Sequence, residues 1–364
     1  MKNQLNLCCP INVSTGYGIT SINTTISMSK LVDVSLFNVG GQMGVDNPEH
    51  KDVLIPLLNN SLVYDKKSPC LKIWHQHDLA TRIGIGDYYV MPFFEADKLY
   101  DREIYQINQA DGIFTPTKWG KEVLENNGIK IPIYVCPLGV DLKIFTPNII
   151  STENTDFTFL HVGKWETRKS QEFLLKAFEL AFNPEDKVKL WLLPYNPFLT
   201  EEENKKWLDL IDENKLASKI TAYGRLPTHY DVAKIMKSAD CGVFLSRAEG
   251  WNNEIPEMMA VDKPIIATNY SAHTEYCTKD NSFLVDIDET EPANDGKWFH
   301  GNGNWAKLGE KQLEQTIEHM RFVYNNNVRT NPNGVETAKL YSWDNTASVI
   351  HQTLLENNSY NANT

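Results

Sequence analysis

The 364-residue sequence has no uninterrupted apolar run approaching the ~20 residues that a membrane-spanning helix needs. Its amino terminus, MKNQLNLCCPINV, also lacks the long apolar segment of a secretory signal peptide. No basic amphipathic helix suited to a membrane surface is evident either. These absences predict a protein without a stable membrane anchor.

The sequence has few cysteines, and their spacing excludes the common metal and redox motifs. There is no C-x-x-C pair and no histidine cluster at zinc spacing. Several cysteines lie in apolar, strand-like runs, as is typical of buried reduced thiols, and this predicts a cytoplasmic location. The six are Cys8, Cys9, Cys70, Cys136, Cys241 and Cys277.

An excess of positive charge is absent as well. The chain carries 35 Lys and Arg against 47 Asp and Glu, a formal net charge of −12. This balance argues against a large, sequence-independent grip on a polyanion such as duplex DNA. The hydrophobic content of 41% is that of a globular protein, and the length favours two domains.

Short apolar runs alternate with amphipathic helical segments, such as 118–127 and 170–182, along the whole chain. Continuous apolar strands that alternate with helices predict an α/β protein whose parallel sheets are covered on both faces. The runs expected to form strands are 5–9, 31–39, 53–58, 71–75, 88–94, 112–116, 133–137, 157–163, 188–193, 220–224, 241–246, 264–268 and 282–285.

The strand–helix pattern restarts after the polar stretch 145–156, FTPNIISTENTD, which we interpret as a linker. We therefore expect a first domain over 1–150 and a second over 151–340. The remaining segment, 341–364, is expected to hold a helix near 344–358, with Asp344 as its N-cap, and a frayed tail.

The first candidate site is a glycine turn, STGYGITS, which contains Gly16 and Gly18 and follows the first strand. Backbone N–H groups at such a strand-to-helix turn can face an anion. The turn partly matches the dinucleotide fingerprint, but the third glycine is missing and no acidic residue closes the second strand. The interpretation of the chain as a nicotinamide dehydrogenase rests on this turn alone. The alternative is that the segment is an ordinary strand-to-helix turn.

The second candidate is the loop GKWETRKS, residues 163–170, which leads from a strand into a helix. Its three cations, Lys164, Arg168 and Lys169, repel one another unless negative charge lies among them. A diphosphate is the obvious candidate for that charge. A solvated basic loop is the alternative for this segment taken alone.

The third candidate, SRAEGWNNEIPE at 246–257, leaves a buried strand, turns through Gly250 and starts a helix at about Glu254. Glu249 and Glu257 flank the start of that helix, where the helix dipole favours a phosphate. Glu257 is expected to bind a ribose diol and Glu249 the hydroxyls of a sugar. Stabilisation of the helix dipole explains Glu257 equally well, but it does not explain Glu249.

Segment 246–257 resembles the E-x7-E signature of the family 4, retaining, GT-B glycosyltransferases, although Asn252 and Glu254 stand where that family usually has Gly and Pro. Loop 163–170 resembles the family's G-R-L-x-x-x-K-G, with Lys164 where Arg is usual and Lys169 matching. Segment 133–145 resembles its G-V-D-x-x-x-F signature, and residues 341–343, YSW, resemble the Ser-Trp before its final helix.

The resemblance implies a GT-B fold: two Rossmann-like parallel-sheet domains with a cleft between them, and a C-terminal helix that crosses back to the first domain. The first domain would lie on the acceptor side and the second would bind the donor. The implied activity is transfer of a hexose-type sugar, with retention, from a nucleotide diphosphate sugar, first of all a UDP-sugar, to a hydroxyl acceptor. No cofactor is implied and no metal is strictly required; the D-x-D pattern Asp286-Ile287-Asp288 is more typical of a solvated acidic stretch.

Two further segments of the first domain are expected to face the cleft. His75 and His77 lie in WHQHD at the end of a strand, and Glu95 ends YYVMPFFE, which resembles the Trp/Phe-x-Glu of one branch of the family. The candidate catalytic residues are Glu249, Lys169, Lys164, His77 and Glu95. The candidate donor-binding residues are Gly16, Gly18, Gly163, Arg168, Gly224, Arg225, Gly250, Trp251, Asn252, Asn253 and Glu257.

The acceptor is the open question at this level. It is a saccharide, a lipid-linked glycan, a protein, a small metabolite or, in a viral setting, a modified DNA base. Rival functions are another GT-B activity, such as an epimerase or a phosphorylase, and a non-catalytic module that binds sugar nucleotides.

Overall fold

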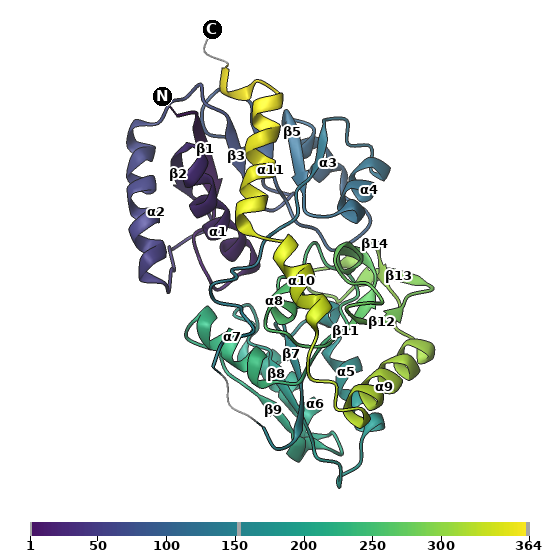
Figure 1. Cartoon of the computed structure of the whole chain (residues 1–364). Coiled ribbons are helices and arrows are strands. Elements are labelled where there is room, and N and C mark those ends of the chain that lie inside the picture. Colours follow the sequence, from purple (N-terminus) through teal and green to yellow (C-terminus); the bar gives the residue numbers. More distant parts are fainter. Residues whose placement is uncertain (1, 151–153, 362–364) are drawn as a thin grey trace. The chain divides into compact units, whose positions relative to one another are not determined.

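The computed structural model describes residues 2–150 and 154–361, which form two compact units (Figure 1). One unit comprises Met1–Asp141 with Leu340–Thr364, and the other Leu142–Lys339. The division thus falls ahead of residue 150, because the segment that follows Asp141 belongs to the second unit. Part of the expected linker, 151–153, and the end of the expected tail, 362–364, lie outside the described residues. The described part of the tail is not frayed, because Ser359 is buried and its hydroxyl lies 2.8 Å from Tyr89 Oη.

The first unit is built on a six-stranded, fully parallel sheet of order β2-β1-β3-β4-β5-β6. Several of its strands are buried along almost their whole length, because helices cover both faces of a parallel sheet. The strands are β1 (Gln4–Cys9), β2 (Asp33–Asn38), β3 (Cys70–Lys72), β4 (Tyr88–Val90), β5 (Gly112–Thr115) and β6 (Ile133–Val135).

Helix α1 (Gly16–Leu31) follows β1 with Thr15 as its N-cap, whose side chain accepts a hydrogen bond from the Gly18 amide. Glycine is required at position 18, because a Cβ there would lie 1.7 Å from the carbonyl oxygen of Asn12. The other long helices of this unit are α2 (Pro48–Asn60), α3 (Asp101–Ile107), α4 (Lys118–Asn126) and α11 (Trp343–Glu356).

Helix α11 returns the end of the chain to the first unit, where it packs against α1. Its N-cap is Ser342, whose hydroxyl accepts from the Asn345 amide; Asp344, the expected cap, lies inside the first turn. The bridge between Val140 and Ser342 leaves no room for a side chain at Gly139, where a Cβ would lie 2.2 Å from the Trp343 amide nitrogen. The signature resembling G-V-D and the Ser-Trp pair are therefore adjacent in space.

The second unit holds another six-stranded parallel sheet, of order β12-β11-β10-β7-β8-β9. Its strands are β7 (Phe157–Val162), β8 (Val188–Leu193), β9 (Ile220–Ala222), β10 (Cys241–Phe244), β11 (Ile265–Asn269) and β12 (Phe283–Asp286). Its long helices are α5 (Gln171–Ala181), α6 (Glu201–Asp212), α7 (His229–Ser238), α8 (Glu254–Ala260) and α9 (Glu310–Asn325), followed by α10 (Pro332–Leu340). The predicted α/β class with two parallel sheets is confirmed.

The strand expected over 53–58 is wrong, because these residues belong to α2. Asn47 caps this helix through a hydrogen bond from the Glu49 amide, and Pro48 occupies its first position. Of the helix residues only Leu54 is fully buried, so the apolar run covers one side of the unit and is not enclosed within a sheet.

An antiparallel hairpin that the sequence did not predict, β13 (Thr290–Asn294) and β14 (His300–Ala306), follows β12. It attaches to the loop after β10: the Ala306 amide donates to the Arg247 carbonyl at 2.8 Å, and the Arg247 side chain pairs with Glu291. The six cysteines are all buried free thiols, as expected.

In each parallel sheet the strand order reverses at one point, which lies between β1 and β3 in the first unit and between β7 and β10 in the second. In open α/β sheets, ligands bind beyond the carboxyl ends of the strands at this switch point. The loops that follow β7 and β10 are the two segments, 163–170 and 246–257, that the sequence singled out.

Candidate active site

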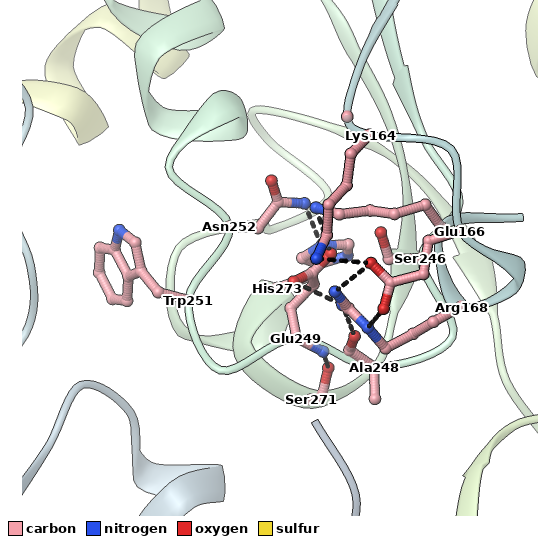
Figure 2. Close-up of polar contacts among 12 residues, drawn as sticks. Lys164, Glu166, Arg168, Ser246, Ala248, Glu249, Trp251, Asn252, Ser271 and His273 are labelled. Carbon is pink, nitrogen blue, oxygen red and sulfur yellow. Dashed lines mark hydrogen bonds and ion pairs between the residues drawn. The ribbon is translucent and has the colours of Figure 1, made fainter. Parts of the chain in front are cut away.

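The loops after β7 and β10 meet in a buried group of charges, which we call the ion cluster: Lys164, Glu166, Arg168, Lys169 and Glu249 (Figure 2). Glu249 lies at its centre. The Glu249 carboxylate is 2.8 Å from Arg168 Nη1 and 2.7 Å from Lys169 Nζ. All three side chains are more than nine-tenths buried.

Glu166 forms the second negative charge of the ion cluster. It pairs with Arg168 Nε at 3.2 Å and with Lys164 Nζ at 3.3 Å. Lys164 is the exposed member, with 37% of its side chain accessible, and its ammonium lies 5.6 Å from the ring centre of Phe198. Three cations and two carboxylates give these five residues one net positive charge, and Glu254 acts on Lys169 from outside the ion cluster.

The mutual repulsion expected among the three cations is therefore relieved first by the protein's own carboxylates. Burial by itself would raise the pKa of Glu249, but Arg168 and Lys169 outweigh it and hold that pKa well below the usual range. Burial would lower the pKa of Lys169, but Glu249 and Glu254 raise it. Both groups are charged at neutral pH.

The turn that carries these cations is fixed by a buried glutamine at the start of α5. The Gln171 side-chain amide donates to the carbonyl oxygens of Gly163 and Lys164, at 3.0 and 2.8 Å. It also lies 3.2 Å from His161 Nε2, and His161 Nδ1 in turn donates to the Val243 carbonyl at 2.8 Å. This chain of contacts connects β10, β7 and the turn.

The loop that carries Glu249 is held by a short 3-10 turn, η4 (Ser271–Glu275), which follows β11. The Glu249 amide donates to Ser271 Oγ at 2.9 Å, and the Tyr276 hydroxyl contacts the carbonyl oxygens of Trp251 and Asn252. Neither the serine nor the tyrosine was predicted as a functional residue. The signal was available, because SAHTEY follows the strand next to β10 and the ends of adjacent parallel strands share one edge.

Two departures from the family pattern occur at left-handed backbone positions. Asn252, which replaces the usual glycine, has φ +74°, and Ser170, which follows Lys169 where the family has glycine, has φ +59°. Asparagine is among the side chains that tolerate this conformation best. Both positions therefore have the left-handed backbone conformation that favours glycine, although neither residue is glycine.

The other candidates of the second unit occupy less central positions. Trp251 packs edge-on against Tyr276, and Figure 2 shows its ring pointing away from the ion cluster. Glu257 is buried in the first turn of α8, as expected. Arg225 is exposed after β9, 6.0 Å from the Tyr195 ring, and Gly224 has open space where a Cβ would lie.

The candidates of the first unit form a separate group at its own switch point. The rings of Tyr17 and His75 lie 4.4 Å apart, and the rings of His75 and His77 stack at 5.1 Å. The Gln106 side chain holds this loop through the His77 carbonyl at 2.9 Å. Glu95 is half-buried, and its role, like that of His77, stays a prediction.

The glycine turn of the first unit does not complete a dinucleotide site. Gly16 and Gly18 form the first turn of α1, and Gly18 is explained by its packing on Asn12. The second strand ends in Asn38, whose side-chain oxygen accepts from the Ile11 amide at 3.0 Å. An acidic residue at this place, which would bind the adenosine ribose of NAD, is not present.

Within residues 2–150 and 154–361, no group of three or more His, Cys, Asp or Glu side chains could hold a metal ion. In the D-x-D segment, Asp286 accepts from the Asn269 side chain at 3.2 Å, and Asp288 pairs with Lys311 at 2.5 Å. Among the helices of the described chain, none has the length and apolar character needed to cross a membrane.

Comparison with known proteins first places a family domain in the second unit: residues 156–295 match the model for glycosyl transferases group 1. An uncharacterized glycosyltransferase of Methanocaldococcus jannaschii is 26% identical over 113 residues, which are 31% of this chain and 26% of the relative. The alpha-monoglucosyldiacylglycerol synthase of Streptococcus pneumoniae is 23% identical over 173 residues, 44% of this chain and 38% of the synthase. The chain thus spans between a quarter and two fifths of the length of these curated relatives.

Solved structures match over nearly the whole chain. Sucrose-phosphate synthase from Thermosynechococcus elongatus has a TM-score of 0.71 at 14% identity and covers 98% of this chain and 99% of its own. The Anabaena protein HepE, in complex with UDP and glucose, has a TM-score of 0.68 at 13% identity, with 97% and 100% covered. The fold is therefore the GT-B fold of glycosyltransferases.

The match over residues 156–295 confirms the resemblance to group 1 glycosyltransferases for this segment of the chain.

Replacing Ser170 by glycine is expected to raise the free energy of unfolding by about 0.5–1 kcal/mol, because a non-glycine residue in the left-handed region is strained. Its buried hydroxyl also has no hydrogen-bond partner among the described residues. Ser271, at φ +52°, is the matched control, since its hydroxyl accepts from the Glu249 amide. Ser271→Gly gains the same relief but leaves the buried Glu249 amide without its acceptor, at a cost of about 1–3 kcal/mol, so its net effect should be a loss of about 1 kcal/mol. Urea unfolding measures the stability of both variants. A change of the same sign in the two would contradict the different roles given to the Ser170 and Ser271 hydroxyls.

Acidification is expected to destabilise the protein from about pH 6.5 downwards. Burial lowers the pKa of His161 and of His273 to about 4, so between pH 4 and 6.5 the unfolded chain binds more protons than the folded one. Each histidine should cost about 3 kcal/mol over this window. Urea titrations at several pH values measure the slope. His161→Asn keeps an N–H for the Val243 carbonyl without titrating and should flatten the slope; an unchanged slope would refute the account.

Proposed function

We propose that the protein is a retaining glycosyltransferase that moves a hexose from a UDP-sugar to a hydroxyl acceptor. The observation that carries this proposal is the ion cluster at the switch point of the second unit, with its one net positive charge. A donor diphosphate would bring the negative charge that the ion cluster lacks. The Anabaena relative of the same fold, solved with UDP and glucose, supports a UDP-hexose as the donor.

Cleavage of the bond between the sugar and the phosphate proceeds through an oxocarbenium-like transition state, in which negative charge grows on the leaving phosphate. Fixed cations are most effective where that charge develops. Lys169 and Arg168 are held in place by Glu249, so little reorganisation is needed when the charge appears. Lys164, partly exposed beside Glu166, is the cation with freedom to follow the phosphate.

The role proposed for Glu249 is to bind hydroxyls of the donor sugar and to orient the two cations. Its carboxylate is paired with Arg168 and with Lys169, and a carboxylate with such a low pKa is a weak nucleophile. This favours a mechanism in which the leaving phosphate takes the proton of the acceptor, over a covalent intermediate on Glu249. The acceptor itself is not specified by these residues.

Replacing Lys169 by alanine is expected to lower turnover of a UDP-hexose by about 10²–10³-fold, comparable to the loss of one transition-state donor. Release of UDP in the presence of acceptor extracts is the measurement. The matched control is Lys205→Ala, which removes an equally close but exposed ion pair with Asp209. Normal turnover by a folded Lys169→Ala variant would exclude the ion cluster as the diphosphate site.

Replacing the two glutamates of the E-x7-E segment is expected to change different kinetic parameters. Glu249→Ala should abolish transfer, because it removes the sugar contact and unpairs two buried cations. Glu257→Ala should mainly raise the KM for the donor, as expected for a ribose contact. Steady-state kinetics over a range of donor concentrations distinguish the two effects, with thermal unfolding as the check on folding. The reverse pattern would exchange the two roles.

A further inference from the structure

Asn252 lies in the loop just before α8, at a position where the family usually has glycine and therefore no side chain. The residue is 6% exposed, and its side-chain oxygen has no hydrogen-bond partner among the described residues. Buried amide oxygens are seldom left without a donor, because the loss of hydration is costly. Two neighbouring groups, Thr268 and His273, determine how the amide is oriented.

The first of these groups is Thr268, at the end of β11. Its hydroxyl lies 2.7 Å from the Ser246 carbonyl oxygen, which can only accept, so the hydroxyl hydrogen is used there. Two oxygens of Thr268 face His273 Nδ1: the carbonyl oxygen at 3.0 Å and the hydroxyl oxygen at 3.2 Å. Both can therefore only accept a hydrogen bond from this nitrogen. The proton of the imidazole must lie on Nδ1.

The second group is the His273 ring. Burial lowers its pKa to about 4, so the ring is neutral at neutral pH and carries a single N–H. With the proton on Nδ1, Nε2 can only accept a hydrogen bond. Asn252 Nδ2 lies 2.9 Å from Nε2 and is the donor.

The orientation of the amide follows from these contacts, because Nδ2 must face His273 and Oδ1 must face the opposite way. Figure 2 shows the oxygen on the side of the amide away from the imidazole, in the loop between Glu249 and α8. The backbone is held at the same place, since Tyr276 Oη lies 3.2 Å from the Asn252 carbonyl oxygen. The oxygen is therefore a fixed acceptor a few residues from the central carboxylate.

We propose that the Asn252 side-chain oxygen accepts a hydrogen bond from one hydroxyl of the donor sugar and thereby determines which hexose is bound, with His273 as its positioning residue. This inference rests on the proposed function. A polyhydroxy ring supplies the O–H donor that the oxygen lacks, and a site built around such a contact rejects the analogue without that hydroxyl. The buried Ser246 hydroxyl and the Asn253 side-chain oxygen, which also lack hydrogen-bond partners in the described chain, lie in the same loop.

The test is a calorimetric titration with UDP-glucose, UDP-galactose and the four monodeoxy analogues of whichever hexose binds more tightly. The wild-type protein should bind at least one deoxy analogue roughly tenfold more weakly than its parent, which corresponds to about 1.4 kcal/mol. Asn252→Gly keeps the left-handed backbone and should lose the discrimination at that one position only. His273→Phe should reduce the same discrimination, because the amide is then free to rotate.

The matched control is Asn358→Gly, which makes the same change at an exposed left-handed position, φ +56°, in the other unit. It should discriminate as the wild type does. If Asn252→Gly binds every analogue with the wild-type ratios, this inference is overturned while the proposed function stands. If the wild-type protein binds neither UDP-hexose, the proposed function fails as well, so the two failures are distinguishable.

Discussion

The pairing of Glu249 with Arg168 and Lys169 is the interaction on which the rest of the second unit's site depends. A buried carboxylate is costly to desolvate, and it is tolerated only when opposite charges and hydrogen bonds surround it. Here the two cations come from the loop after β7 and the carboxylate from the loop after β10, so the pairing joins the two sides of the topological switch point. The site is preformed because pairing among these three charges offsets the cost of burying each of them.

The surrounding residues keep this arrangement in one geometry. Gln171 fixes the turn that carries the cations, Ser271 binds the Glu249 amide, and His273 orients Asn252. The hairpin β13–β14 adds a brace, since Arg247, two residues before Glu249, pairs with Glu291 and lies over the Trp305 ring. A ligand phosphate that replaces one of these contacts meets hydrogen-bond donors that are already in position. Donors held in position in this way stabilise the charge that develops in a transition state.

Much of the fold could be predicted from the sequence, because buried parallel strands appear as continuous apolar runs. Twelve of the thirteen expected strands contain or overlap strands of the structure; the exception, 53–58, is an apolar run on a helix that begins at a cap and a proline. The hairpin could not be predicted in this way, because TEPAN and HGNGNWA do not alternate apolar and polar residues. Glu249 and Lys169 were singled out from local motifs. Glu166 pairs with its own loop neighbours Lys164 and Arg168, and its charge alone did not distinguish it from a solvated acidic residue. Ser271 and His273 contact the loop after β10 because β10 and β11 are adjacent in the sheet, so finding them requires the strand order as well as the motif.

The central claim is that the ion cluster receives the diphosphate of a nucleotide sugar. Calorimetric titration with UDP and with uridine tests it most directly, because the two ligands share the base and ribose and differ in the diphosphate. The account predicts that the wild-type protein prefers UDP by at least roughly tenfold, or about 1.4 kcal/mol, and that Lys169→Met removes most of this preference. Equal binding of UDP and uridine by the wild-type protein, or an undiminished preference in a folded Lys169→Met variant, would contradict it.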